Sequence, residues 1–168
     1  FGSGDHATTR GCLQILDGLA KSSVFLRPLD MGCGSGILAL AMAKTWRRLV
    51  VAADQDSEAI RATHANASMN RVASLIRTAH GSGFRSEVVK RKSPYDLIVA
   101  NILARPLIAM ASDVDKHLQR KESGGGTVIL SGLLEADARR VIGPYRARGF
   151  ILQRTLVFNG WLTLTLTR

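Results

Sequence analysis

The sequence is poor in cysteine and has no long apolar run. It holds only Cys12 and Cys33, with no CxxC pair and no cluster of histidine and cysteine at zinc-binding spacing. We therefore expect two small core residues, no disulfide framework and no metal site. The longest apolar runs, such as residues 37–43, fall well short of the roughly 20 residues that span a bilayer. These absences predict a protein of a reducing compartment, the cytoplasm, without a membrane partner.

The start of the chain has neither an initiator methionine nor the apolar core of a signal peptide. A length of 168 residues is enough for one domain with a sizeable core and short for two. We therefore expect residues 1–168 to form a single domain, and Phe1 to lie inside a longer natural sequence.

Aromatic residues are also scarce, at 5%, whereas positive charge is in excess. The formal net charge is +10, from 23 Lys and Arg against 13 Asp and Glu. Basic residues gather at 90–92, 116–121 and 139–148, without the interleaved aromatics of a base-stacking surface. We interpret these runs as solvated surface, so that a nucleic-acid partner is compatible with the sequence but not required by it.

Apolar runs bounded by turn residues alternate with stretches of helical periodicity, which indicates an α/β fold with a mostly parallel sheet and helices on both faces. A threonine is expected to cap the first helix, residues 80–93 are expected to be irregular, and Asn159-Gly160 predicts an antiparallel hairpin between the last two strands. The expected helices lie at 8–21, 36–46, 57–69, 104–118 and within 135–149, and the expected strands at 25–30, 49–54, 74–78, 95–101, within 124–132, and at 150–158 and 161–167.

The stretch DMGCGSG places Gly32, Gly34 and Gly36 at alternate positions behind the first strand. Ile37 stands where the third glycine of a dinucleotide-binding loop would be, and no Gly-Lys-Ser/Thr of a phosphate-binding loop is present. A cofactor without phosphate but with a ribose and an amino-acid part fits, as in S-adenosylmethionine. We expect Asp30 to hold its ammonium, directly or through water, and loop N–H groups to bind its carboxylate.

Two further polar residues stand at the predicted ends of strands. Asp54 ends the second strand, where a carboxylate can accept hydrogen bonds from both ribose hydroxyls. The alternative is a helix cap, for which Asp56 is the better candidate. Asn101 ends the fourth strand and can hold a donor group of cofactor or acceptor, although asparagine is also a common turn residue. No proline pair follows Asn101, which disfavours the Asn-Pro-Pro arrangement used on amides and bases.

Several motifs resemble, in order and spacing, those of the catalytic domain of the bacterial PrmA methyltransferases. They are FGSGDHATT at 1–9, DMGCGSGILA at 30–39, DQD at 54–56, ANILA at 100–104 and LSGLL at 130–134. The resemblance implies a seven-stranded Rossmann-like methyltransferase fold and S-adenosylmethionine as methyl donor. It also implies, as substrate, amino groups of the eleventh protein of the large ribosomal subunit, and a separate amino-terminal recognition domain, which we expect to be absent from this chain.

Carried over by position, the resemblance also implies site residues. The cofactor-contacting set would be Thr9, Gly32, Asp54 and Asn101. The loop closing over the methionine part would hold Phe1, Gly2, Gly4 and His6.

The leading hypothesis is therefore methyl transfer from S-adenosylmethionine to a protein amine, most simply a lysine side chain or amino terminus of a ribosomal protein. Asn101 is the candidate for positioning the acceptor, and no residue is assigned as general base. Two alternatives stay open. One is methylation of another protein lysine or of a small molecule, and the other is a non-catalytic module that binds RNA or the ribosome.

Overall fold

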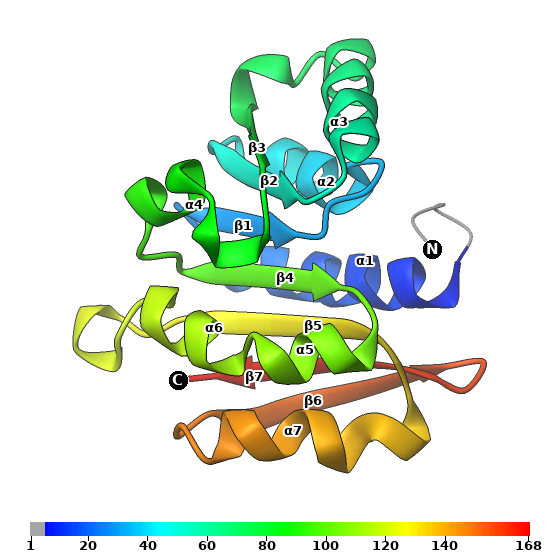
Figure 1. The fold of residues 1–168 in the computed structure, drawn as a ribbon, viewed down its shortest axis with the longest axis vertical. Helices are drawn as coiled ribbons and strands as arrows, with labels where there is room; N and C mark the ends of the chain where they lie inside the picture. The colour runs from blue at the N-terminus through cyan, green and yellow to red at the C-terminus, as the bar shows by residue number, and fades with distance from the viewer. Residues whose placement is uncertain (1–5) are drawn as a thin grey trace.

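Seven strands form one sheet in the order β3-β2-β1-β4-β5-β7-β6 (Figure 1). This computed structural model describes residues 6–168. Strands β1 to β5 run parallel, whereas β7 is antiparallel to both β5 and β6. The strands are β1 (Pro28–Met31), β2 (Val50–Asp54), β3 (Ile76–His80), β4 (Leu97–Asn101), β5 (Thr127–Leu134), β6 (Ile151–Phe158) and β7 (Trp161–Thr167). The predicted mostly parallel sheet with a carboxy-terminal antiparallel hairpin is confirmed.

Helices cover both faces of the sheet, as predicted. One buried cluster joins α1 (Ala7–Ala20), α2 (Ile37–Trp46) and α3 (Ser57–Met69) to the sheet. The cluster on the other face contains α4 (Glu87–Lys92), α5 (Ala104–Ala109), α6 (Ala111–His117) and α7 (Ala138–Arg146). Successive strand residues face opposite sides of the sheet, so residues two positions apart share a side. Leu29 and Met31 accordingly both pack against the second group of helices.

The closing hairpin turns at Asn159 and Gly160, with φ of 49° and 77°. Two positive φ angles in a row belong to the turn that matches the twist of antiparallel strands, which is why Asn-Gly predicts it. Further along the sheet, β5 carries an irregularity between Ser131 and Leu133. A Cβ on Gly132 would lie 2.3 Å from the Ile102 carbonyl oxygen, so glycine lets β5 approach the chain beyond β4 closely.

The ends of two elements differ from the prediction. The cap of α1 is His6, not a threonine, because the His6 Nδ1 accepts the Thr8 N–H at 3.4 Å, while Thr8 itself is buried in the first turn. Strand β1 begins at Pro28, three residues after the predicted start at residue 25. The N–H groups of Leu26 and Arg27 donate to the Asp96 carboxylate at 2.5 and 2.9 Å instead of joining a strand.

Three other segments were also predicted incorrectly. The helix expected at 104–118 is interrupted at Met110, where the Asp113 N–H bonds the Met110 carbonyl in a tightened turn. Strand β3 begins at Ile76, after a short 3₁₀ turn. The stretch at 80–93, expected to be irregular, contains the short helix α4, whose Val89 is fully buried against the sheet.

Candidate cofactor site

The glycine loop joins β1 to α2 at the carboxyl edge of the sheet. All three of its glycines have positive φ: +74° at Gly32, +54° at Gly34 and +82° at Gly36. A Cβ at Gly32 would lie 2.4 Å from Ile102, and one at Gly36 would lie 2.8 Å from Thr63. A Cβ at Gly34 would meet no atom of residues 6–168 within 4 Å. Packing among these residues therefore requires glycine at positions 32 and 36 but not at position 34.

Four N–H groups of this loop donate hydrogen bonds within the protein. Those of Gly32 and Cys33 donate to the Ala53 carbonyl at 2.8 and 3.0 Å, and that of Gly34 donates to the Asp54 Oδ2 at 2.9 Å. The Gly36 N–H bonds the Cys33 carbonyl at 2.8 Å. A ligand carboxylate at any of these four N–H groups would have to displace a bond, so the expected carboxylate contact stays a prediction.

Two side chains of α3 donate hydrogen bonds to the glycine loop, and the sequence analysis did not predict them. The Thr63 hydroxyl donates to the Gly34 carbonyl at 2.9 Å, and the Asn66 Nδ2 donates to the Ser35 carbonyl at 2.8 Å. Thr63 is fully buried. Their spacing of three residues on one helix face is the signal that could have found them, because such residues point the same way.

Asp30 is buried beneath the loop, with 1% of its surface exposed. Its Oδ2 accepts the Ala39 N–H of the first turn of α2 at 2.9 Å, which satisfies one of that helix's free donors. Its Oδ1 has no hydrogen-bond partner within residues 6–168. Burial raises the pKa of Asp30 from about 3.8 to about 7; the Ala39 bond lowers it and the Asp54 charge raises it further. The predicted ammonium contact stays a prediction.

Asp54 lies at the end of β2 with both carboxylate oxygens toward backbone donors. Oδ2 accepts the Gly34 N–H at 2.9 Å and Oδ1 the Asp56 N–H at 3.0 Å. An ionised carboxylate has about four acceptor sites, so each oxygen keeps capacity for a ligand donor. Asp56 is the cap of α3, accepting the Glu58 N–H at 2.9 Å, as the sequence favoured.

Asn101 ends β4 and faces α1. Its Nδ2 donates to the Thr9 hydroxyl at 3.4 Å, which brings together two predicted residues that are 92 positions apart. Its Oδ1 is buried without a partner in the described part of the chain. His6, at the start of α1, makes an edge contact with the Trp161 ring at 5.3 Å. Phe1, Gly2 and Gly4 lie outside the described residues.

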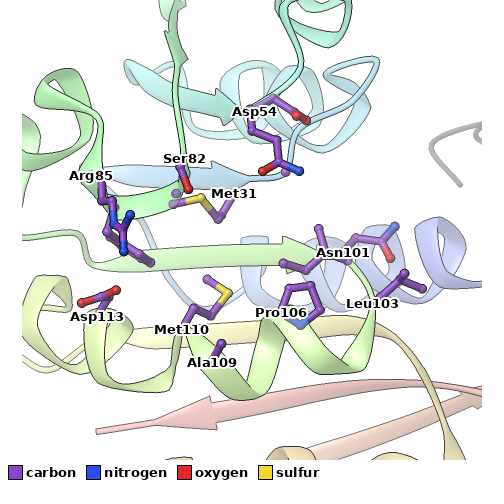
Figure 2. A pocket seen from close by; sticks show the side chains of 15 residues that line it. Met31, Asp54, Ser82, Arg85, Asn101, Leu103, Pro106, Ala109, Met110 and Asp113 are labelled. Carbon is purple, nitrogen blue, oxygen red and sulfur yellow. The ribbon is translucent and has the colours of Figure 1, made fainter.

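A cavity of about 720 Å³ opens at this edge (Figure 2). Gly32, Asp54 and Asn101 line it, whereas the other predicted residues that the structure describes, His6, Thr9, Asp30, Gly34 and Gly36, do not. Figure 2 shows Asn101 and Leu103 at one end, and Arg85 and Asp113 at the other. The lining residues that the prediction lacked include Ser82, Gly83, Phe84, Pro106 and Met110. The glycine-containing stretch directly after β3 was the available signal for the first of them.

The two cysteines play no part in this cavity. Both are buried free thiols, as expected, and burial raises the pKa of each to about 12. Among residues 6–168, no group of three or more His, Cys, Asp or Glu could hold a metal ion. In the same part of the chain, no helix is long and apolar enough to cross a membrane.

The sequence and the fold are similar to those of known proteins. The family model for ribosomal protein L11 methyltransferase (PrmA) matches residues 1–168. The chain belongs to the PrmA family. A PrmA relative from Rhodopseudomonas palustris (strain BisB5) is 42% identical over 168 residues, which are 100% of this chain and 56% of the relative. One from Bradyrhizobium diazoefficiens is 44% identical with the same coverage. Both are called ribosomal protein L11 methyltransferase.

A solved structure agrees with the PrmA assignment. The crystal structure of a ribosomal protein L11 methylase from Lactobacillus delbrueckii subsp. bulgaricus superposes with a TM-score of 0.85 at 30% identity, covering 99% of this chain and 81% of that chain. The seven-stranded Rossmann-like methyltransferase fold is thereby confirmed. The chain spans only about half the length of the curated PrmA relatives that it matches, 56% in both cases above.

Proposed function

We propose that residues 1–168 form one S-adenosylmethionine-dependent catalytic domain, which transfers methyl groups to amino groups of ribosomal protein L11. The observation that carries this proposal is the meeting of Gly32, Asp54 and Asn101, from three strand ends, at one cavity. The names of the PrmA relatives support the ribosomal substrate. A ribosomal protein as substrate would place the reaction in the cytoplasm.

The residues at the cavity fit S-adenosylmethionine. The cavity's volume of about 720 Å³ lies in the usual range for cofactor sites, about 300 to 1,000 Å³. The free acceptor capacity of Asp54 suits two ribose hydroxyls. Gly32 has no side chain, which lets the loop pack closely against Ile102. The unpartnered Asn101 Oδ1 requires a donor, which an ammonium or amine N–H supplies. We assign Thr9 the role of orienting the Asn101 amide through its hydroxyl.

S-adenosylmethionine, when bound, supplies a methyl group on a sulfonium that is already activated for transfer. The task of the protein is then to align the acceptor amine and to exclude water. A free lysine has a pKa near 10.4, whereas the attacking amine must be neutral. We assign acceptor positioning to Asn101, whose Oδ1 would accept an N–H from that amine, and to the segment that precedes α1. We assign no general base.

Cofactor binding is the first test, by calorimetric titration of S-adenosylhomocysteine into the purified protein. Asp54→Asn keeps the size of the side chain but turns one acceptor oxygen into a donor. We expect about a 10- to 100-fold loss of affinity, since hydrogen bonds to charged groups contribute about 1.5 to 3 kcal/mol. Asp56→Asn removes the same charge two residues away and retains a capping side chain, so it should bind as the parent does. Equal affinity in all three proteins would overturn the proposed site.

Substrate identity needs a second test, because the same cofactor site could serve another protein lysine or a small molecule. Purified ribosomal protein L11 is incubated with the enzyme and S-adenosylmethionine, and mass increments of one methyl group are followed by mass spectrometry. We expect methylated L11 with the parent and much less with Asn101→Ala. Intact cofactor binding with no transfer to L11 would leave the assignment as a methyltransferase in place and overturn the assignment of L11 as the substrate.

A further inference from the structure

The edge of the sheet opposite the cavity carries five exposed cationic side chains, here called the basic edge: Arg27, Arg47, Arg48, Arg91 and Lys92. Arg27 directly precedes β1, the pair at 47–48 lies just before β2, and the pair at 91–92 ends α4, which leads into β4. The strand order β2-β1-β4 sets these three connections side by side, on the left of Figure 1. Residues up to 65 positions apart thus share one edge.

A groove of about 320 Å³ is hollowed into the basic edge. Arg27, Arg91 and Lys92 line it, together with aliphatic side chains such as Leu26 and Leu49. The Arg47-Arg48 pair adjoins Leu49 in the chain, so all five cations of the basic edge lie in or beside this groove.

The positive charge of the basic edge is not neutralised from within. Among the described residues, none of its five side chains takes part in an ion pair, whereas the neighbouring Lys90 pairs with Glu87 at 2.9 Å. Two carboxylates lie near the basic edge. One is Glu87, whose pKa is lowered mainly by Lys90 and also by the charge of Arg91. The other is Asp96, whose two oxygens accept the backbone N–H groups of Leu26 and Arg27. The surface therefore keeps a net positive charge that favours a polyanion.

We propose that the basic edge binds the phosphate backbone of double-stranded RNA. The aromatic residues nearest to it, Phe25, Trp46 and Tyr95, are 8%, 8% and 1% exposed. Buried rings provide neither a platform on which single-stranded bases stack nor the interfacial aromatics of a membrane-binding surface. Phosphate contacts from arginine and lysine remain, and they recognise a duplex by its backbone. The choice of RNA rests on the proposed ribosomal substrate.

The basic edge and the cofactor cavity lie at opposite ends of the central strands. A strand such as β4, with five residues, separates the two edges by roughly 16 Å at about 3.3 Å per residue. RNA on the basic edge would leave the cavity open to cofactor and substrate. The two ligands should therefore bind independently.

The test measures fluorescence anisotropy of a labelled duplex RNA of about 20 base pairs over a series of salt concentrations. Arg91→Gln/Lys92→Gln removes two groove-lining charges. Arg139→Gln/Arg154→Gln is the matched control, because it removes two exposed charges from α7 and β6, outside the groove. Each lost phosphate contact lowers the slope of log affinity against log salt by about one. We expect the groove variant to bind more weakly, with a slope reduced by about two, and the control to keep the slope of the parent.

The proposal would be overturned by no RNA binding by the parent, by equal weakening in the groove and control pairs, or by competition between RNA and S-adenosylhomocysteine. Vesicles rich in phosphatidylserine are tested alongside, and groove-dependent binding to vesicles without binding to RNA would also overturn it. Calorimetry with S-adenosylhomocysteine on the same samples separates the two proposals. Normal cofactor binding without RNA binding contradicts only the proposal that the basic edge binds RNA. RNA binding without cofactor binding contradicts only the proposed cofactor site.

Discussion

Ionisation of Asp30 should make the stability of this protein fall as the pH rises. Burial raises the pKa of this carboxyl group to about 7 in the folded protein, from about 3.8. Between these two values the folded protein holds a proton that the unfolded chain has released. The free energy of unfolding therefore decreases with increasing pH across this interval, and the stabilisation is complete only below the unfolded pKa.

The size of the effect follows from the two pKa values. Between about pH 5 and pH 8, the ionisation of Asp30 should lower the free energy of unfolding by roughly 2 to 3 kcal/mol. Asp30→Asn cannot ionise, and its amide oxygen can still accept the Ala39 N–H. Its amide nitrogen takes the place of the unpartnered Oδ1, which costs about 1 to 3 kcal/mol at every pH, so the comparison rests on the pH dependence.

Urea unfolding of the parent and of Asp30→Asn over this pH range is the assay. The parent should lose roughly 2 to 3 kcal/mol more than the variant between about pH 5 and pH 8. Other titrating groups are common to both proteins and cancel in the difference. Parallel curves would refute the burial argument, because they would show that Asp30 ionises in the folded protein as readily as in water.

The same pH series tests the predicted ammonium contact. A bound cation near Asp30 favours its ionised form, so S-adenosylhomocysteine should bind the parent more tightly as the pH passes through about 7. Asp30→Asn should lack this dependence. If affinity depends on pH in the same way in the parent and in Asp30→Asn, then Asp30 does not contact the cofactor. Its role would then be only to bond the first turn of α2.

Three further predictions concern the loop and its surroundings. Gly36→Ala should lower the free energy of unfolding by about 2 to 5 kcal/mol, from positive φ and the clash with Thr63, and Gly34→Ala by only about 1 to 2 kcal/mol; equal losses in urea unfolding would contradict the packing argument. Asp56→Ala should cost about 1 kcal/mol through the lost cap of α3 while calorimetry shows unchanged cofactor affinity. Thr9→Val should weaken S-adenosylhomocysteine binding about 2- to 10-fold by releasing the Asn101 amide, with Thr9→Ser binding like the parent; unchanged affinity in the valine variant would exclude the positioning role.

Local sequence patterns predicted most of the fold because each depends on neighbouring residues. The Asn159-Gly160 turn requires two positive φ angles, and these two residue types accept them. The Asp56 cap and the strand that ends at Asp54 were predicted for the same kind of local reason. The errors arose where a distant group intervened, as when Asp96 takes the N–H groups of Leu26 and Arg27 and delays β1 by three residues.

The sequence by itself determined the alternation of strands and helices, the closing hairpin, the glycine loop and the polar residues at the strand ends, since these follow from periodicity and backbone preferences. Only the tertiary structure decided which neighbours those residues meet. It placed Thr9 against Asn101, buried Asp30 under α2, set Gly36 against Thr63, and gathered the basic edge from three separate connections. The physical reason is that such contacts depend on strand order and on the packing of helices against the sheet, which join residues tens of positions apart and leave no trace in a short window of sequence.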